Sequence, residues 1–540
     1  MKVQSIHQYE PSNKISKKQN QSFGAGISPA LNFLQTNQAI GATAVDMGFM
    51  CTPRTIVDFT RSPQAGVETM RREYSSSLND AFLGMYGMGA AALLAKGLNK
   101  KFDVNAHKLF IDNNRLDILA DIKSKTGDLN KDANLKKYLG EIVDSTTAFN
   151  PLDTAKADAN GWVKIGDKTK TTLVDKLAEE INADATAKGA KKKTNDLKKV
   201  LKSILIEDTG AEADFKISRK ILDSKENWVQ KSSTSSVDDY IDNIIKTSKM
   251  FQSQKVHDTF KQGQSVLDNS FVKGLKGLNA KTTIAGIGFC AALGALVQPI
   301  NIWLTKKQTG STAFVGGGEE NKTAGFKALK AGLAGVGMVG VLRSIGNFKD
   351  VFSKIQFKGP LPTIPQFKLV YGITIASRFL SARNENELRE SVIKDTLGFA
   401  NWLILGGFVS KLAALGLEKG AAKKGNPITL LKYNKQEAKG APKWLAGQVL
   451  SREEVLRSAL AKAGKSTIKA DGKAMNLSEL MKLAKQHTPK ALKSAKLLNL
   501  VQVAGYIYSG LALGIGVPKL NIAITNAINA KKANQQAEKA

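Results

Sequence analysis

Two long stretches without a charged residue constrain the fold of this chain more than any other feature. Residues 282–305 (TTIAGIGFCAALGALVQPINIWLT) and 497–518 (LLNLVQVAGYIYSGLALGIGVP) are uncharged over 24 and 22 positions, and lysines stand at both ends of each. A helix needs roughly 20 apolar residues to cross about 30 Å of hydrocarbon. Both stretches meet this length, so the sequence predicts at least two transmembrane helices.

Four shorter apolar stretches leave the number of membrane spans open between two and six. They are residues 81–95, 331–342, 369–377 and 396–410. Runs of about 10–15 apolar residues are as typical of buried helices as of spans. We therefore expect an all-α fold of Gly/Ala-rich apolar helices, with transmembrane segments among them, and two Lys-rich polar helical domains.

Small residues recur at helical spacing inside the apolar stretches. The repeats are Gly286, Cys290 and Gly294; Gly288 and Ala292; and Gly510 and Gly514. Residues four apart lie on one face of a helix, and small ones let two helix backbones approach closely. In a lone water-exposed helix each interior glycine would cost about 0.5–1 kcal/mol relative to alanine. The pattern therefore predicts helix-packing positions at Gly286, Cys290, Gly294, Gly510 and Gly514.

The apolar stretches alternate with polar ones, which predicts a domain order. We expect a polar, disordered N-terminus (1–45), an apolar helical segment (46–98), a polar helical domain (99–275), an apolar region with up to four membrane or core helices (276–417), a second polar helical domain (418–495), an apolar transmembrane helix (496–530) and a polar tail (531–540). Ser451 with Glu454, and Asn476 with Glu479, have the spacing of helix capping boxes. The first residues lack an apolar core, so no cleavable signal peptide is expected.

The net charge of +32 predicts an anionic partner or a strongly solvated surface. The chain holds 12 arginines and 67 lysines. Arginine reads phosphates and guanine edges in a bidentate way, whereas lysine is a hydrated point charge. The composition therefore favours anionic lipid head groups or a plain solubilising role over nucleic acid as the partner of this charge.

No residue pattern predicts catalysis, a metal or a cofactor. The four histidines lie far apart in the sequence. Gly316, Lys322 and Thr323 form a near miss to a phosphate-binding loop, but Asn321 replaces its second glycine and two glutamates would repel phosphate. Residues 335–340 match G-x-G-x-x-G inside an apolar helical stretch, where helix packing explains them better. Residues 381–397 are highly charged and predict an amphipathic helix, which either lies at a membrane interface or belongs to an ordinary helix bundle. Its covered face would carry Leu388, Val392, Ile393 and Leu397, and the acidic pair Glu385/Glu387 is expected on its solvated face.

These observations predict a multi-pass, non-enzymatic α-helical membrane protein with a scaffold, structural or pore-like role. Its expected partners are the lipid bilayer, further copies of itself or other membrane proteins. Two alternatives stay open. One is a secreted pore-forming or translocator-type protein that stores insertable helices in its core. The other is a basic protein associated with nucleic acid, whose affinity would fall steeply with salt.

Overall fold

The chain is mostly helical, which confirms the expected fold class in its coarse form. The structure is a computed structural model, in which 73% of residues are helical and 6% lie in strands. It describes residues 23–36, 38–153, 155–183, 190–212, 214–223, 227–260, 265–314, 320–359, 361–400, 407–433, 438 and 440–537. The expectations for residues 1–22 and for Gly316 fall outside these ranges.

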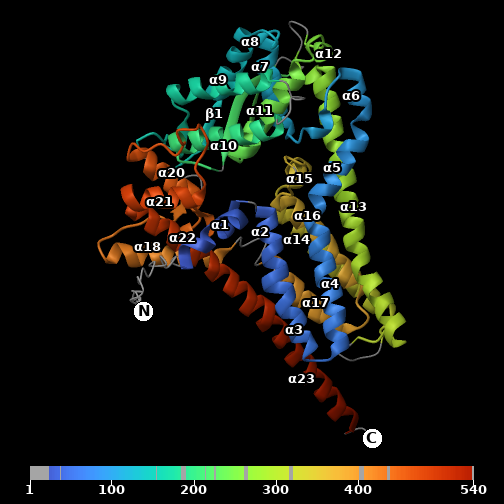
Figure 1. Cartoon of the computed structure of the whole chain (residues 1–540). Helices are drawn as coiled ribbons and strands as arrows, with labels where there is room; N and C mark the ends of the chain where they lie inside the picture. The colour runs from blue at the N-terminus through green and yellow to red at the C-terminus, as the bar shows by residue number, and fades with distance from the viewer. Residues whose placement is uncertain are drawn as a thin grey trace, which may run out of the picture.

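A bundle of helices packs against one side of α13 (Ser270–Thr309), the long helix along one side of the molecule in Figure 1. α13 packs against α4, α5 and α16, and α14 packs against α16. The helices of the bundle are α3 (Thr52–Phe59), α4 (Pro63–Ala81), α5 (Leu83–Leu94), α6 (Lys96–Phe102), α14 (Ala324–Ile345), α15 (Phe348–Ile355), α16 (Ile364–Ser381) and α17 (Glu385–Phe399). Phe357, Phe367 and Tyr371 lie at the centre of its apolar core.

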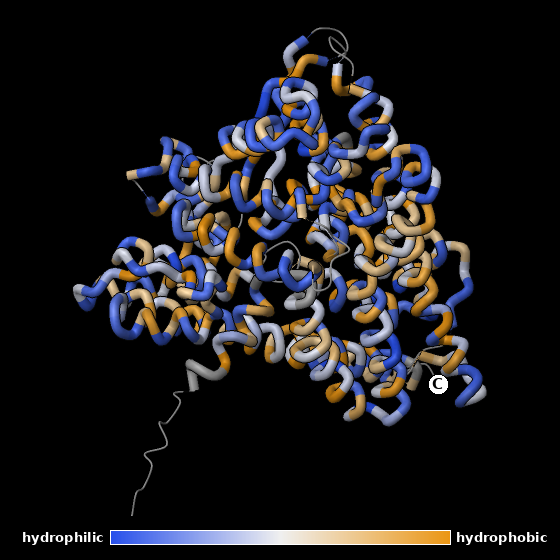
Figure 2. The backbone as a smooth tube through the Cα atoms, turned by 45° about the horizontal axis from the view of Figure 1, so that its top comes forward, coloured by the Kyte–Doolittle hydropathy of each residue, from blue (hydrophilic) through white to orange (hydrophobic). Residues whose placement is uncertain are grey.

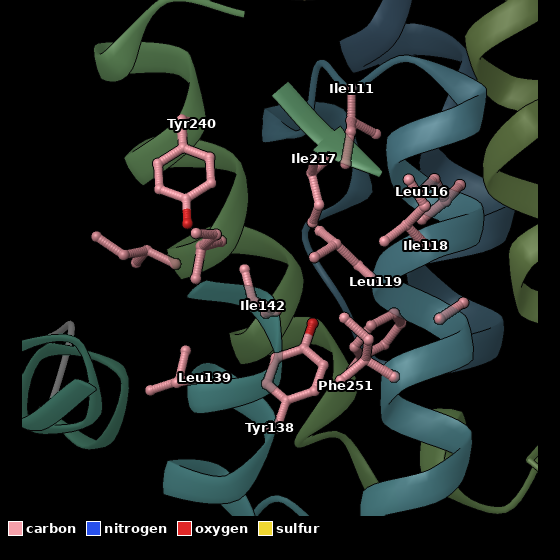
Figure 3. Close-up of a cluster of buried hydrophobic side chains, with 14 of the residues drawn as sticks. Ile111, Leu116, Ile118, Leu119, Tyr138, Leu139, Ile142, Ile217, Tyr240 and Phe251 are labelled. Carbon is pink, nitrogen blue, oxygen red and sulfur yellow. The ribbon is translucent and has the colours of Figure 1, made fainter. Parts of the chain in front are cut away.

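A polar domain covers the N-terminal end of α13. Its helices are α7 (Asn113–Thr126), α8 (Asp132–Asp144), α9 (Asp167–Asn182), α10 (Ala190–Thr209), α11 (Val237–Phe251) and α12 (Gln254–His257). Its apolar core includes Leu119, Tyr138 and Ile142, whose side chains point toward one another in Figure 3. Phe271 and Leu275 of α13 belong to the same core. α13 therefore joins the polar domain to the apolar bundle, and α6 does so as well through Phe102, which lies in the same core.

The polar domain also contains a four-stranded antiparallel sheet, which the sequence analysis did not predict. The strands are β1 (Thr146–Phe149), β2 (Trp162–Lys164), β3 (Phe215–Leu222) and β4 (Trp228–Ser235), in the order β2-β1-β3-β4. β3 and β4 pair along their full length, from Phe215 opposite Ser235 to Leu222 opposite Trp228. Phe215 and Ile217 are buried, and the residue between them is less so, as expected for a strand with one covered face.

The C-terminal quarter of the chain forms a second polar part and then a long helix. Its elements are α18 (Phe408–Lys423), β5 (Leu431–Lys432), α19 (Lys443–Ala446), β6 (Gln448–Val449), α20 (Arg452–Lys462), α21 (Leu477–His487), α22 (Pro489–Tyr508), the π-helical stretch η5 (Ser509–Gly516) and α23 (Val517–Ala537). Both predicted capping boxes are confirmed, at Ser451 with Glu454 and at Asn476 with Glu479. α23 extends past the rest of the bundle to the C-terminus in Figure 1.

The described residues of the expected disordered N-terminus are helical. α1 (Phe23–Thr36) and α2 (Gln38–Val45) lead into the π-helical stretch η1 (Asp46–Cys51). α1 packs against α22, where the Asn499 side chain donates to Ser28 Oγ at 2.7 Å. Arg452 donates to Gln35 Oε1 at 2.7 Å. These polar contacts, together with the buried Leu31, attach α1 to the second polar part.

Lys123 of α7 is buried in the polar domain and gives it a pH-dependent stability. Its amine donates to the Gly127 carbonyl and lies 3.1 Å from His257 Nδ1. Burial lowers the pKa of Lys123 to about 8. Between pH 8 and the ordinary lysine pKa of about 10.5, the unfolded chain therefore binds this proton while the folded chain releases it. The cost of burying the charge is complete below pH 8 and declines as the pH rises through this window.

We therefore expect Lys123→Met to be most favourable, relative to the parent protein, at neutral pH. Between pH 7 and pH 10 the unfolding free energy of the parent should rise by roughly 1–2 kcal/mol relative to that of Lys123→Met. This is less than the full effect of the pKa shift, because solvent screens part of it. Amide hydrogen exchange of α7 at several pH values measures it. The control is Lys125→Met on the same helix, where the side chain is 46% exposed. A difference that stays constant with pH would contradict the prediction.

Candidate membrane-facing surface and buried ion network

Three helices of the described chain are long and apolar enough to cross a membrane. They are α13, α14 and the continuous 47-residue helix Pro489–Gln535 made by α22, η5 and α23. α13 and the C-terminal helix contain the two long uncharged stretches. α14 contains residues 331–342, which the sequence left open between a span and a buried helix. The most apolar part of each helix is mostly uncovered, with 39%, 17% and 22% of its residues buried, respectively.

One side of α13 presents a continuous row of large apolar side chains. This row, the α13 apolar face, consists of Ile284, Phe289, Leu293, Leu296, Ile300 and Trp303, which are 36–64% exposed. From Phe289 to Trp303 their spacing is three or four residues, which keeps these five on one side of the helix, and Ile284 extends the exposed apolar surface toward the N-terminal end of α13. Further exposed apolar side chains are Met85 and Leu93 on α5, Val336 and Val339 on α14, and Ile507 and Leu511 on the C-terminal helix. Figure 2 shows hydrophobic residues concentrated in this part of the molecule, while the polar parts are mostly hydrophilic.

The opposite side of α13 carries small and polar residues that are all buried. These are Gly286, Cys290, Gly294, Gln298, Asn301 and Thr305. A Cβ atom placed on Gly286 would lie 2.9 Å from Gly87 Cα, and one on Gly294 would lie 2.5 Å from Thr374 Oγ1. Cys290 is fully buried, with its Sγ 3.5 Å from the Asn79 carbonyl oxygen. α13 therefore approaches α5 and α16 closely through the positions that the small-residue spacing indicates.

A matched pair of glycines tests this packing. Gly286→Ala should destabilise the bundle by about 1–3 kcal/mol, because the added methyl group meets the backbone of α5 rather than a movable side chain. Gly288→Ala, on the same helix, meets nothing within 4 Å and should stabilise it by about 0.5–1 kcal/mol through helix propensity. Thermal unfolding of both variants in detergent gives the comparison. Equal effects of the two substitutions would contradict the packing assignment.

The remaining residues singled out in the sequence lie in the C-terminal helix (Gly510 and Gly514) and at the start of α14 (Lys322 and Thr323). A Cβ on Gly514 would lie 2.7 Å from the Phe49 carbonyl oxygen, whereas one on Gly510 would make an ordinary contact at 3.6 Å. Lys322 pairs with Glu320, and Thr323 accepts a hydrogen bond from the Phe326 amide as the N-cap of α14. Among the described residues, no group of three or more His, Cys, Asp or Glu side chains could hold a metal ion.

The interior of the bundle contains an ion network centred on Glu73 of α4. Arg54 of α3 lies 3.4 Å from the Glu73 carboxylate, Lys394 of α17 lies 3.0 Å from it, and Arg378 of α16 lies 3.7 Å from it. Arg72 completes the set at 3.1 Å. All five side chains are 10% exposed or less. One carboxylate therefore holds cations from four different helices.

A second buried group connects this network to the polar side of α13. Arg383 pairs with Glu68 of α4 at 2.6 Å and with Glu387 of α17 at 2.8 Å. Gln298 donates to Glu387 Oε1 at 3.1 Å, and Asn301 donates to the Glu68 carbonyl oxygen at 3.0 Å. The polar residues at the C-terminal end of α13 therefore satisfy carboxylates and carbonyls inside the bundle.

A third group attaches α23 to the bundle beside a small polar cavity. Arg61 donates to both carboxylate oxygens of Glu390 at 3.1 Å, and Thr525 of α23 donates to Glu390 at 2.6 Å. The cavity has a volume of about 40 Å³ and is lined by charged residues of all three groups, including Lys394 and Arg72. This volume accommodates a few water molecules.

The charged side of α17 is largely buried, so the expectation of a solvated face within residues 381–397 is wrong. Glu387 and Asp395 are buried, with 2% and 0% of their surface exposed, and Lys394 is buried as well. Leu397, which the amphipathic pattern placed on the covered face, is 44% exposed. The polar face of this helix points into the bundle because Arg383, Arg378 and Glu73 provide partners for it there.

The placement of arginine is the signal that could have revealed the network from the sequence. Seven of the 12 arginines are buried, and Arg343 is the one that lies exposed. The buried lysines among the described residues are Lys123, Lys394 and Lys432. A guanidinium stays charged and donates five hydrogen bonds in a fixed geometry, which suits a buried ion pair, whereas lysine suits the surface. Arginines that gather at residues 54–72 and 378–389 of a lysine-rich chain therefore indicate internal ion pairs.

No protein-family model, curated protein or solved structure matches this chain.

Proposed function

We propose that this chain is an α-helical integral membrane protein with a non-enzymatic, structural role. Its apolar bundle would lie in the bilayer, and its two polar parts would lie in water. The observation that carries the proposal is the distribution of side chains in the bundle. Paired charged groups, those of the Glu73 network, lie in its interior beside the apolar core, and large apolar groups such as those of the α13 apolar face cover its exterior.

This distribution is the reverse of the one that water favours. Removing one large apolar side chain from water contributes roughly 1.5–3 kcal/mol, so exposing the whole α13 apolar face to water would be costly. Hydrocarbon favours apolar side chains on the exterior of a protein, whereas water favours polar ones. Ionised side chains within a membrane are tolerated where they face the bundle interior and pair with one another. Both halves of the pattern therefore support a lipid environment for the bundle.

The same observations support this reading over the two alternatives. A soluble protein that stores its insertable helices would cover them, but the apolar faces of α13 and α14 are largely uncovered. A nucleic-acid-binding protein would present arginine at its surface, but most arginines of this chain are inside. The cavity beside the ion network has room for only a few water molecules, which supports an anchoring or scaffolding role over an open pore.

Membrane fractionation of cells that produce the full chain tests the proposal. After washing membranes with high salt and then with alkaline carbonate, we expect the protein to remain in the pellet and to be released by detergent. Salt removes proteins that bind head groups through lysine, so this step separates insertion from electrostatic adhesion. Recovery in the soluble fraction after either wash would overturn the proposal.

A further inference from the structure

An apolar cavity of about 220 Å³ lies between α14, α16 and α17. Its walls include Gly337 and Gly340 of α14, Ile375 and Phe379 of α16, and Phe399 of α17. None of the lining side chains is charged, and Thr396 is the one that carries a hydroxyl group. A smaller apolar cavity, roughly 150 Å³, stays free of water and takes up benzene. The cavity is therefore large enough for an apolar ligand and offers water few hydrogen bonds.

The glycines of the G-x-G-x-x-G sequence create this cavity. A Cβ on Gly340 would meet nothing within 4 Å, and one on Gly337 would approach Phe379 no closer than 4.0 Å. Nearby, a Cβ on Gly372 would lie 2.6 Å from Val341, so α14 and α16 touch closely beside the open space. The two helices thus touch at Val341 and Gly372 and leave a slot beside this contact, where Gly337 and Gly340 of α14 have no side chains.

The slot opens beside apolar surface. Gly340 and Thr396 are exposed parts of its wall. Val336, Val339 and Leu397 stand next to them in sequence or one helical turn away, and they are 44–74% exposed. α14 is also the least covered of the three candidate spans. A hydrocarbon chain lying against this side of the bundle could therefore enter the slot without passing a charged group.

We propose that this cavity binds one acyl chain of a bilayer lipid. This inference rests on the proposed membrane location, because it takes the exposed side of α14 to be in contact with lipid. A chain inserted between α14, α16 and α17 would fill space that the side chains leave open, so it would gain dispersion contacts that lipid at a flat helix surface does not make. The lipid would then stabilise the packing of α14 against the rest of the bundle.

Photolabelling of the full chain in phosphatidylcholine vesicles tests this site. The probe is a phosphatidylcholine with a diazirine in one acyl chain, and mass spectrometry maps the labelled residues. We expect labels on α16 and α17 residues that line the cavity, such as Ile375 and Phe399, in addition to labels on the α13 apolar face. Gly337→Leu should reduce the cavity labels roughly tenfold, which corresponds to about 1.4 kcal/mol of binding free energy.

Gly335→Leu is the matched control, since this residue lies on α14, meets nothing within 4 Å and does not line the cavity. It should leave the labelling unchanged, and Gly340→Leu repeats the test if Gly337→Leu does not fold. Labels on the α13 apolar face without cavity labels would overturn this inference and leave the proposed function intact. Labels in neither place would overturn both. Competition by palmitate but not by unlabelled phosphatidylcholine would overturn the assignment to a bilayer lipid.

Discussion

Glu73→Gln is expected to destabilise the bundle by about 3–5 kcal/mol, the usual cost of breaking a buried ion pair from one side. The amide has almost the shape of the carboxylate but no charge. Arg378 would then keep its ion pair with Asp395 at 2.8 Å. Arg54, Arg72 and Lys394 would each lose the ion pair that they make with Glu73. The effect is large because four cations lose the same counter-charge.

Two buried thiols allow this loss to be measured in detergent. Cys51 and Cys290 are both buried in the bundle, so a thiol-reactive dye labels them only when the bundle unfolds. The temperature at which the dye labels these cysteines should fall strongly in Glu73→Gln. Adding Lys394→Met should raise that temperature part of the way back, because it removes one uncompensated cation. Asp175→Asn is the control, because its ion pair with Lys136 is exposed to water and should contribute little to stability. An unchanged labelling temperature in Glu73→Gln would contradict the role of the network.

The combined substitution Ile284→Glu, Leu296→Glu and Ile300→Glu is expected to reduce membrane retention strongly. Each charge placed in the middle of a spanning helix costs about 2.5–3.5 kcal/mol for insertion. All three residues are about half exposed or more, so the bundle interior should stay intact. The measurement is the fraction of protein in the pellet after a carbonate wash.

The matched control places the same charges on exposed apolar residues of the polar domain. Leu152, Leu222 and Trp228 are 37–64% exposed, and replacing them by glutamate should leave membrane retention unchanged. Protection of Cys290 from a thiol dye, on the buried side of α13, checks that the variant bundle is folded. Retention of the α13 variant in the carbonate-washed pellet would contradict the assignment of its apolar face to lipid.

The sequence predicted the features that depend on local pattern. Length without charge identified α13 and the C-terminal helix, and the spacing of Ser451 and Glu454 identified the start of α20. The spacing of Gly286, Cys290 and Gly294 identified residues that lie on one buried side of α13. Each of these signals is contained within one turn or one helix, so no knowledge of a distant partner is needed.

The features that the sequence did not predict depend on distant partners. β1 and β2 have four and three residues, which is too short for a recognisable alternation. β3 does alternate at Phe215 and Ile217, but Arg219 interrupts the alternation before Ile221 resumes it. Glu387 and Asp395 appeared to be solvated, because a helix cannot show in its own sequence that Arg383 and Arg378 will meet it inside the fold.

The most direct test of the membrane account measures what surrounds α13 in a bilayer. Nitroxide labels at Ile284, Leu296 and Ile300, placed one at a time in the full chain in phospholipid vesicles, report collisions with oxygen and with a water-soluble nickel complex. Oxygen concentrates in hydrocarbon and the nickel complex stays in water. The account predicts that these labels collide with oxygen and are protected from nickel, whereas a label at Trp228 collides with nickel. Nickel access along the whole α13 apolar face would contradict it.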